Sequence, residues 1–164
     1  LQEGQIVSYD VGAVFHGWNG DAARTVGVGF IDSECQKLID VTEQCFFEGV
    51  KAIKAGVTRL GDLGHAIQSY AESFGYGVVR ELVGHGIGRD MHEQPDVPNY
   101  GNPGHGLRLT SGMTIAIEPM ITMGTYRVEW MSDGWTVKTL DRKPAAHYEN
   151  TVAIFDDRVE ILSL

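Results

Sequence analysis

Three acidic residues interrupt segments that otherwise have the apolar composition of buried β-strands. Asp10 lies among Ile, Val and Tyr residues, Glu118 follows a run of Ile and Ala, and Glu149 precedes a run that contains Val, Ala, Ile and Phe. Burying a carboxylate costs free energy unless the group is paired with a cation or binds a metal ion. Because few basic residues lie close to these positions in the sequence, metal ligation is favoured over a set of buried salt bridges.

The remaining pattern predicts an α+β fold. The segments typical of strands are Gln5–Phe15, Ala22–Phe30, Glu81–Ile87, Met113–Met123, Tyr126–Met131, Trp135–Leu140, His147–Phe155 and Val159–Leu162. One helix is expected to start at Asp32–Gln36, where Ser33 and Gln36 have capping-box spacing, and to end at Gly56. A second helix is expected over Leu60–Phe74. Most strands are followed directly by another strand, so we expect an antiparallel sheet backed by the helices.

Two connections are also predicted. Ser132-Asp133-Gly134 is typical of a hairpin turn, and a long polar loop is expected after Ile87, where Pro95, Pro98 and Pro103 occur. The length of 164 residues suits one domain with its own core.

Asp21 joins the acidic set through the hairpin expected from the first two strands. A turn at Phe15-His16 places Asp10 directly opposite Asp21 on one face of the sheet, with Cβ atoms ~5 Å apart. Two like charges at that separation repel unless a cation lies between them. A tight turn at Asn19-Gly20 is the alternative, in which case Asp21 is a solvated turn residue.

The segment Gly84–Pro95 contains three alternating glycines and two histidines. The glycines allow close backbone approach, and the segment lacks the Lys-Ser/Thr pair of a phosphate loop. His85, between two glycines, is the candidate ligand, and His92 lies beyond an expected turn. Four carboxylates and one imidazole suit two divalent ions of the Mn, Fe, Co or Zn kind, ~3.5–4 Å apart. Such a pair activates a bridging water for attack on a carbonyl or phosphoryl centre.

Charge and cysteine content narrow the partners and the compartment. The 22 acidic residues outnumber the 13 Lys and Arg residues, for a net charge of −9, which argues against nucleic acid and anionic membranes as partners. No apolar run approaches the ~20 residues of a membrane span. Cys35 and Cys45 are expected on one helix, ~15 Å apart and beyond disulfide reach, which favours a reducing compartment.

Motifs along nearly the whole chain carry a family resemblance. They are Asp10-Val11-Gly12, Gly20-Asp21-Ala22, Gly84–Pro95, Ile117-Glu118-Pro119-Met120, Ser132–Val137 and Tyr148-Glu149-Asn150-Thr151. This set resembles the type I methionine aminopeptidases, a family of pita-bread metallopeptidases. The resemblance implies that residues 1–164 form one metallopeptidase catalytic domain with a pita-bread fold, whose first portion lies upstream of Leu1. It also implies a cytoplasmic enzyme, monomeric at full length. The substrate that the resemblance implies is the N-terminal Met of nascent polypeptides with a small second residue, at the ribosome.

The resemblance further implies a role for each metal-site residue. Asp10 would chelate the first of two divalent ions, and Asp21 and Glu149 would bridge the two. His85 and Glu118 would complete the second site. Glu118 would also handle protons for the attacking water.

Three residues would contact the substrate on the same basis. His92 would contact the peptide group and stabilise the tetrahedral oxyanion. Met91 and Trp135 would border the pocket for the methionine side chain, with core packing as the alternative for both. The family's other catalytic histidine and most of the methionine pocket would lie upstream of Leu1. Apolar residues are therefore expected to be exposed, either on the helix faces that carry Leu38, Phe46 and Ile53 or on the sheet.

Some positions depart from the family pattern. Asn150 occupies a position that is usually histidine, and Ala145-Ala146-His147 replaces a common Ser-Ala-Gln. Four histidines match no family role and are expected at the surface or around the site: His16, His65, His105 and His147. Two alternatives stay open: a prolidase or Xaa-Pro aminopeptidase on the same fold, and a catalytically inactive pita-bread domain that binds proteins. Inactive relatives typically lose metal ligands, and this chain keeps all five.

Overall fold

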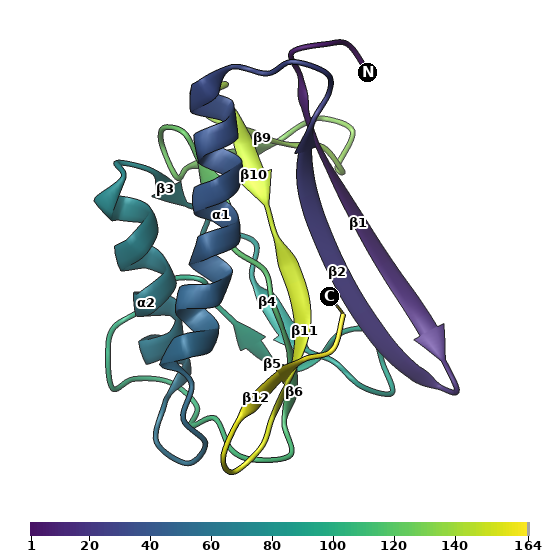
Figure 1. The fold of residues 1–164 in the computed structure, drawn as a ribbon, viewed down its shortest axis with the longest axis vertical. Helices are drawn as coiled ribbons and strands as arrows, with labels where there is room; N and C mark the ends of the chain where they lie inside the picture. Colours follow the sequence, from purple (N-terminus) through teal and green to yellow (C-terminus); the bar gives the residue numbers. More distant parts are fainter. Residues whose placement is uncertain (164) are drawn as a thin grey trace.

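The first two strands form a long hairpin at one edge of the main sheet (Figure 1). In the computed structural model, which describes residues 1–163, β1 (Ile6–Phe15) pairs with β2 (Trp18–Gly27) and the chain turns at His16-Gly17. Both residues of the turn have positive φ, 50° and 78°. Neither turn expected from the sequence is correct.

The turn therefore lies one residue later than Phe15-His16, which shifts the register by two. Gly12, not Asp10, lies opposite Asp21, and Asp10 lies opposite Ala23. Because side chains alternate between faces with a period of two, this shift leaves Asp10 and Asp21 on the same face as diagonal neighbours. The expected proximity is confirmed although the expected pairing is wrong.

The main sheet is antiparallel and has the order β1-β2-β11-β6-β4-β5. Its further strands are β4 (Gly84–Gly86), β5 (Glu93–Val97), β6 (Thr114–Ile117) and β11 (Glu149–Ile154), with β12 (Val159–Ile161) paired to β11. β5 lies inside the segment expected to be a polar loop.

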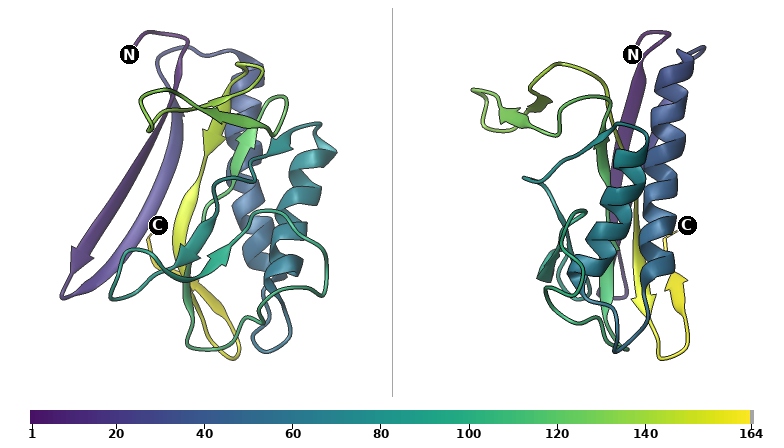
Figure 2. Two further views of the ribbon diagram at one scale, coloured as in Figure 1. Left: turned by 180° about the vertical axis from the view of Figure 1, so that it is seen from behind. Right: turned by 90° about the vertical axis from the view of Figure 1, so that its left-hand side faces the viewer.

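Two smaller sheets complete the strands. β3 (Gly77–Val78), β7 (Met120–Thr122) and β10 (Ala145–His147) form one, and β8 (Val128–Trp130) and β9 (Val137–Thr139) form a hairpin. A turn at Ser132–Gly134 does occur between β8 and β9, within a wider connection. Figure 2 shows this hairpin projecting from the side of the sheet opposite the helices.

Two long strands expected from the sequence are each divided in two. The segment Met113–Met123 breaks at Glu118-Pro119, and the segment from His147 onward breaks at Tyr148. Pro119 has no N–H to continue a ladder, and its carbonyl accepts a hydrogen bond from the Tyr148 N–H at 3.2 Å. The two breaks are in contact with each other. At this point both segments pass between the main sheet and the small three-stranded sheet.

Two helices, α1 (Ser33–Ala52) and α2 (Leu60–Ser73), cover one face of the sheet (Figures 1 and 2). The α1 cap is Asp32, whose side chain accepts from the Glu34 N–H at 2.7 Å. Ser33 is the first residue of the helix and not its cap, so the expected capping box of Ser33 and Gln36 is wrong. Neither helix in residues 1–163 has the length and apolar character that a membrane crossing requires. The cysteines on α1 are both free thiols.

The core lies between the helices and the sheet. Leu38, Phe46 and Ile53 are all buried there, so the expected exposure of this helix face is wrong. The exposed apolar side chains lie instead on the sheet, as the second possibility predicted. On the β1–β2 hairpin these include Val11, Val14, Phe15 and Trp18.

Candidate metal centre

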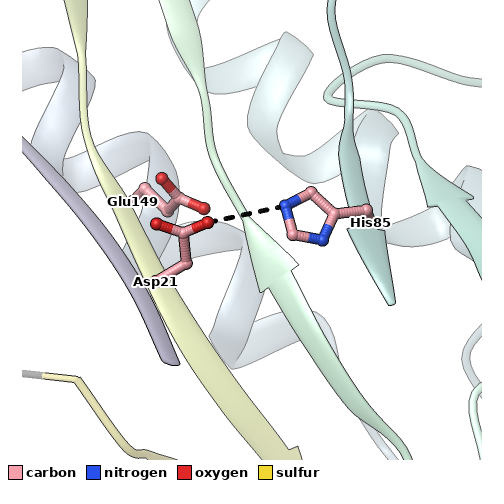
Figure 3. A group of neighbouring side chains, drawn as sticks. All are labelled: Asp21, His85 and Glu149. Carbon is pink, nitrogen blue, oxygen red and sulfur yellow. Dashed lines mark ion pairs between the residues drawn. The ribbon is translucent and has the colours of Figure 1, made fainter. Parts of the chain in front are cut away.

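Four neighbouring strands bring acidic and histidine side chains to one point of the main sheet. Asp21 comes from β2, Glu149 from the start of β11, Glu118 from the end of β6 and His85 from β4. His85 Nε2 lies 3.8 Å from Asp21 Oδ2 and 3.7 Å from Glu118 Oε1. Figure 3 shows Asp21 and Glu149 side by side, facing the His85 ring. Ligand atoms of these three residues all lie within 4.8 Å of one another.

Asp10 completes the set that the sequence predicted. It extends from β1 on the face shared with Asp21 and lines the same cavity as His85 and Glu118. Its pKa is raised, first by burial and then by the negative charge of Asp21. All five predicted ligands therefore converge.

The imidazole of His85 is oriented by its own strand. Its Nδ1 lies 2.8 Å from the carbonyl oxygen of Gly86. A carbonyl only accepts hydrogen bonds, so Nδ1 carries the hydrogen and Nε2 presents its lone pair to the carboxylates. This is the tautomer that a metal ligand requires.

The alternating glycines serve strand packing rather than a ligand. A Cβ atom at Gly84 would collide with the carbonyl oxygen of Ala116 on β6, and one at Gly86 with that of Gln94 on β5. The glycines therefore let β4 fit between its two neighbours, which sets the position of His85.

Hydrogen bonds to the backbone hold the carboxylates in place. The Asp21 N–H donates to Thr151 Oγ1 at 2.9 Å, and Asn99 Nδ2 donates to the Glu118 carbonyl at 2.9 Å. Arg24 Nη1 donates to the Glu149 carbonyl at 2.6 Å. These contacts fix the backbone at the three carboxylates, and the Ala22 N–H also donates to Asp21 Oδ1 at 3.1 Å.

Arg24 also contacts the residue that departs from the family pattern. Its Nη2 donates to Asn150 Oδ1 at 2.7 Å. Arg24 is thus bonded to oxygens other than those of the Glu149 carboxylate. Within residues 1–163, no Lys or Arg forms an ion pair with any of the five predicted ligands.

The electrostatics of the site call for a cation. Burial, followed by the charges of Glu118, Asp21 and Asp10, raises the pKa of Glu149 to about 9. The Glu149 side chain is 1% exposed, and its Oε1 has no hydrogen-bond partner among the described residues. Clustered carboxylates with an unpartnered buried oxygen and an oriented imidazole fit a divalent metal ion.

A cavity of about 730 Å³ opens beside these residues. Residues of the β8–β9 hairpin, which projects from the sheet opposite the helices (Figure 2), contribute to its lining, and apolar side chains form much of its wall. The apolar lining residues are Leu82, Val83, Met120, Trp130, Trp135 and Val137. A cavity with polar groups at one end and an apolar wall is typical of a ligand site.

The three predicted substrate contacts are placed differently from one another. His92 and Trp135 both line the cavity. Met91 is not among the lining residues, and the end of its side chain packs onto Gly12. For Met91, packing is therefore the better-supported of the two alternatives.

His147, which was expected at the surface or around the site without a role there, lies within the acidic cluster. Its Nε2 lies 3.5 Å from Glu118 Oε2, and ligand atoms of Glu118, His147 and Glu149 lie within 4.8 Å of one another. The signal was present, because residues two apart in a strand share a face. His65 and His105 are exposed, and His16 lies in the β1–β2 turn, as expected for surface residues.

The fold is of the pita-bread type, and its donor set is suited to metal binding. Residues 1–156 match the model of metallopeptidase family M24, and the chain belongs to this family. It is 58% identical over 164 residues to a methionine aminopeptidase of Clostridium acetobutylicum, covering 100% of this chain and 65% of that protein. It is 46% identical to methionine aminopeptidase 1 of Bacillus subtilis, in a match that covers 99% of this chain and 65% of that protein. The chain thus spans 65% of the length of these relatives.

Solved structures agree on the fold. The crystal structure of methionine aminopeptidase from Thermotoga maritima matches with a TM-score of 0.95 at 49% identity, covering 99% of this chain and 65% of that one. Prolidase from Pyrococcus furiosus matches with a TM-score of 0.78 at 24% identity, covering 100% of this chain and 42% of that one. The prolidase likeness concerns the fold alone.

Proposed function

We propose that this chain is the metal-binding portion of a methionine aminopeptidase, a hydrolase that removes N-terminal Met from polypeptides with a small second residue. The observation that carries this proposal is the convergence of Asp10, Asp21, His85, Glu118 and Glu149 beside a largely apolar cavity. The 58% identity to a methionine aminopeptidase supports the choice of substrate.

The five ligands divide between two divalent ions. Asp10 would hold the first ion, His85 and Glu118 would hold the second, and Asp21 and Glu149 would be shared between the two. When bound, ions such as Co, Mn, Fe or Zn lower the pKa of a water molecule and polarise the scissile carbonyl.

Proton transfer is assigned to Glu118. Its carboxylate lies at the edge of the cavity, where it can accept a proton from the attacking water and pass it to the leaving amine. His92, in the connection between β4 and β5, lines the same cavity. Its side chain can donate a hydrogen bond to the peptide oxygen as negative charge develops there.

The apolar wall accounts for the Met side chain. Trp130 and Trp135 extend from the β8–β9 hairpin into this wall. An unbranched thioether packs well against aromatic rings. The net charge of −9 is consistent with a polypeptide substrate rather than a nucleic acid. In this proposal the full-length enzyme is a monomer in the cytoplasm. It acts on nascent chains at the ribosome.

The test uses the full-length protein loaded in turn with Co, Mn, Fe and Zn. We expect release of Met from Met-Ala-Ser and no cleavage of an Xaa-Pro peptide. The second candidate, a prolidase or Xaa-Pro aminopeptidase, rests on the fold likeness and predicts the reverse preference. Tight metal binding without cleavage of either peptide would instead support an inactive, protein-binding domain.

A further inference from the structure

We propose that His147 is a sixth protein ligand of the metal centre and binds one of the two ions through Nε2, together with Glu118 and Glu149. This inference rests on the proposed function, because it requires metal ions at this site. It adds a second imidazole to a donor set that otherwise contains only His85.

The position of the His147 ring supports direct ligation. Its Nε2 is buried and has no hydrogen-bond partner among the described residues, and it lies 3.5 Å from Glu118 Oε2. Adjacent ligand atoms that are each about 2.1 Å from one ion are about 3.0–3.4 Å apart, for bond angles between 90° and tetrahedral. The two atoms therefore need to move by only a few tenths of an ångström to share an ion.

Glu118 separates the two imidazoles. Its Oε1 lies 3.7 Å from His85 Nε2, whereas its Oε2 lies 3.5 Å from His147 Nε2. Each oxygen of this carboxylate thus faces a different histidine. Glu149, whose Oε1 also lacks a partner among residues 1–163, supplies the third ligand atom beside His147.

The backbone of His147 is held firmly. The Thr25 hydroxyl accepts from the His147 N–H at 2.8 Å and donates to the His147 carbonyl at 2.8 Å. The Ser8 hydroxyl contacts the same Thr25 oxygen at 2.7 Å. A ring carried on such a fixed backbone is preorganised toward the carboxylates.

A purely positioning role is the competing explanation. In that case Nε2–H donates to Glu118 Oε2 and no bond to an ion forms. His147→Gln separates the two roles, because a glutamine amide can donate the hydrogen bond but provides no imidazole. His65→Gln is the matched control, since His65 is exposed on α2, away from the site.

The experiment loads full-length protein with two equivalents of Co(II) and counts imidazoles by X-ray absorption at the cobalt edge. We expect two imidazoles per ion pair in the wild type and the control, and one in His147→Gln. By calorimetry, the affinity for one of the two cobalt ions should fall more than about 100-fold in His147→Gln, which exceeds the 10–100-fold cost of losing a residue that only supports a ligand. Adding free imidazole to His147→Ala should restore the visible cobalt spectrum.

Three results would overturn the inference. One is an unchanged imidazole count in His147→Gln, with Met release intact in the wild type; the proposed function then stands. A second is failure of free imidazole to restore the spectrum of a His147→Ala protein that is folded by circular dichroism. The third is absence of cobalt binding by the wild type, which overturns the proposed function as well.

Discussion

The rings of His85 and His92 meet edge to face, with centroids 4.4 Å apart. His85 is buried in β4 with its Nε2 toward the carboxylates, whereas His92 is exposed and lines the cavity. The two neighbouring imidazoles therefore differ in what they face. The His85 ring faces the carboxylates of the metal site, and the His92 ring faces the cavity that is open to substrate.

Replacing His92 with alanine should separate these two tasks. We expect His92→Ala to keep its full metal content while turnover of a Met-Ala peptide falls ~10²–10³-fold, the usual effect of losing one oxyanion donor. Elemental analysis of the dialysed protein and steady-state kinetics test this. Depleted metal would instead identify His92 as a ligand.

Replacing Glu118 with glutamine should impair chemistry more than binding. The amide oxygen of Glu118→Gln can still coordinate an ion but cannot accept a proton, so an interaction made in the transition state is lost. We expect kcat to fall by ~10²–10⁴ with a much smaller change in KM. Turnover near the wild-type rate in the metal-loaded variant would exclude the proton-transfer role.

The metal-free protein should become less stable as pH rises. The pKa of Glu149 is raised to about 9 in the folded protein from an ordinary value of 4.5. Between these values the folded state binds more protons than the unfolded state, so the free energy of unfolding decreases with increasing pH. Asp10, whose pKa is also raised, acts in the same direction.

Urea unfolding in the presence of EDTA, at pH 5.5 and at pH 8, measures this dependence. We expect a lower midpoint at pH 8 and a smaller difference in Glu149→Gln, which cannot ionise. Bound metal should abolish the decrease, because a cation stabilises the charged carboxylate. A metal-free midpoint that rises with pH would contradict the assignment.

The packing of β4 gives a further prediction. We expect Gly84→Ala to destabilise the protein by about 1–3 kcal/mol, because its Cβ would collide with the Ala116 carbonyl. Metal affinity should fall too, since His85 follows directly in the strand. Gly20→Ala is the control: nothing lies within 4 Å of a Cβ there, although the position adjoins Asp21. Equal denaturation midpoints for the two variants would refute the packing argument.

The acidic site could be predicted because it depends on strand periodicity. An error of two residues in the β1–β2 register left Asp10 and Asp21 on one face, since the period of a strand is two. Glu118 and Glu149 were identified by the cost of burying a charge among apolar residues, which is independent of the register.

Other features depend on contacts between distant segments. Pro119 is a local sign that the strand is interrupted, but the passage of the chain from one sheet to the other depends on the matching break at Tyr148, far along the sequence. β5 pairs with β4 through backbone groups, and its polar, proline-containing sequence lacks the alternation that marks a strand. The spacing of His147 from Glu149 was a local sign of a shared face, but its position beside Glu118 depends on the pairing of β7 with β10.

The contact between Pro119 and Tyr148 also bears on how such a protein can change over generations. A one-residue insertion or deletion in β6 or β11 would turn Glu118 or Glu149 to the opposite face and break the hydrogen bond between the two crossings. The β8–β9 hairpin forms a separate sheet and is not paired with β6 or β11, so a change in its length leaves the register of these two strands unchanged. Mutant libraries intended to alter substrate preference therefore belong in the hairpin that carries Trp130 and Trp135, while the crossing point tolerates substitution only without a change in length.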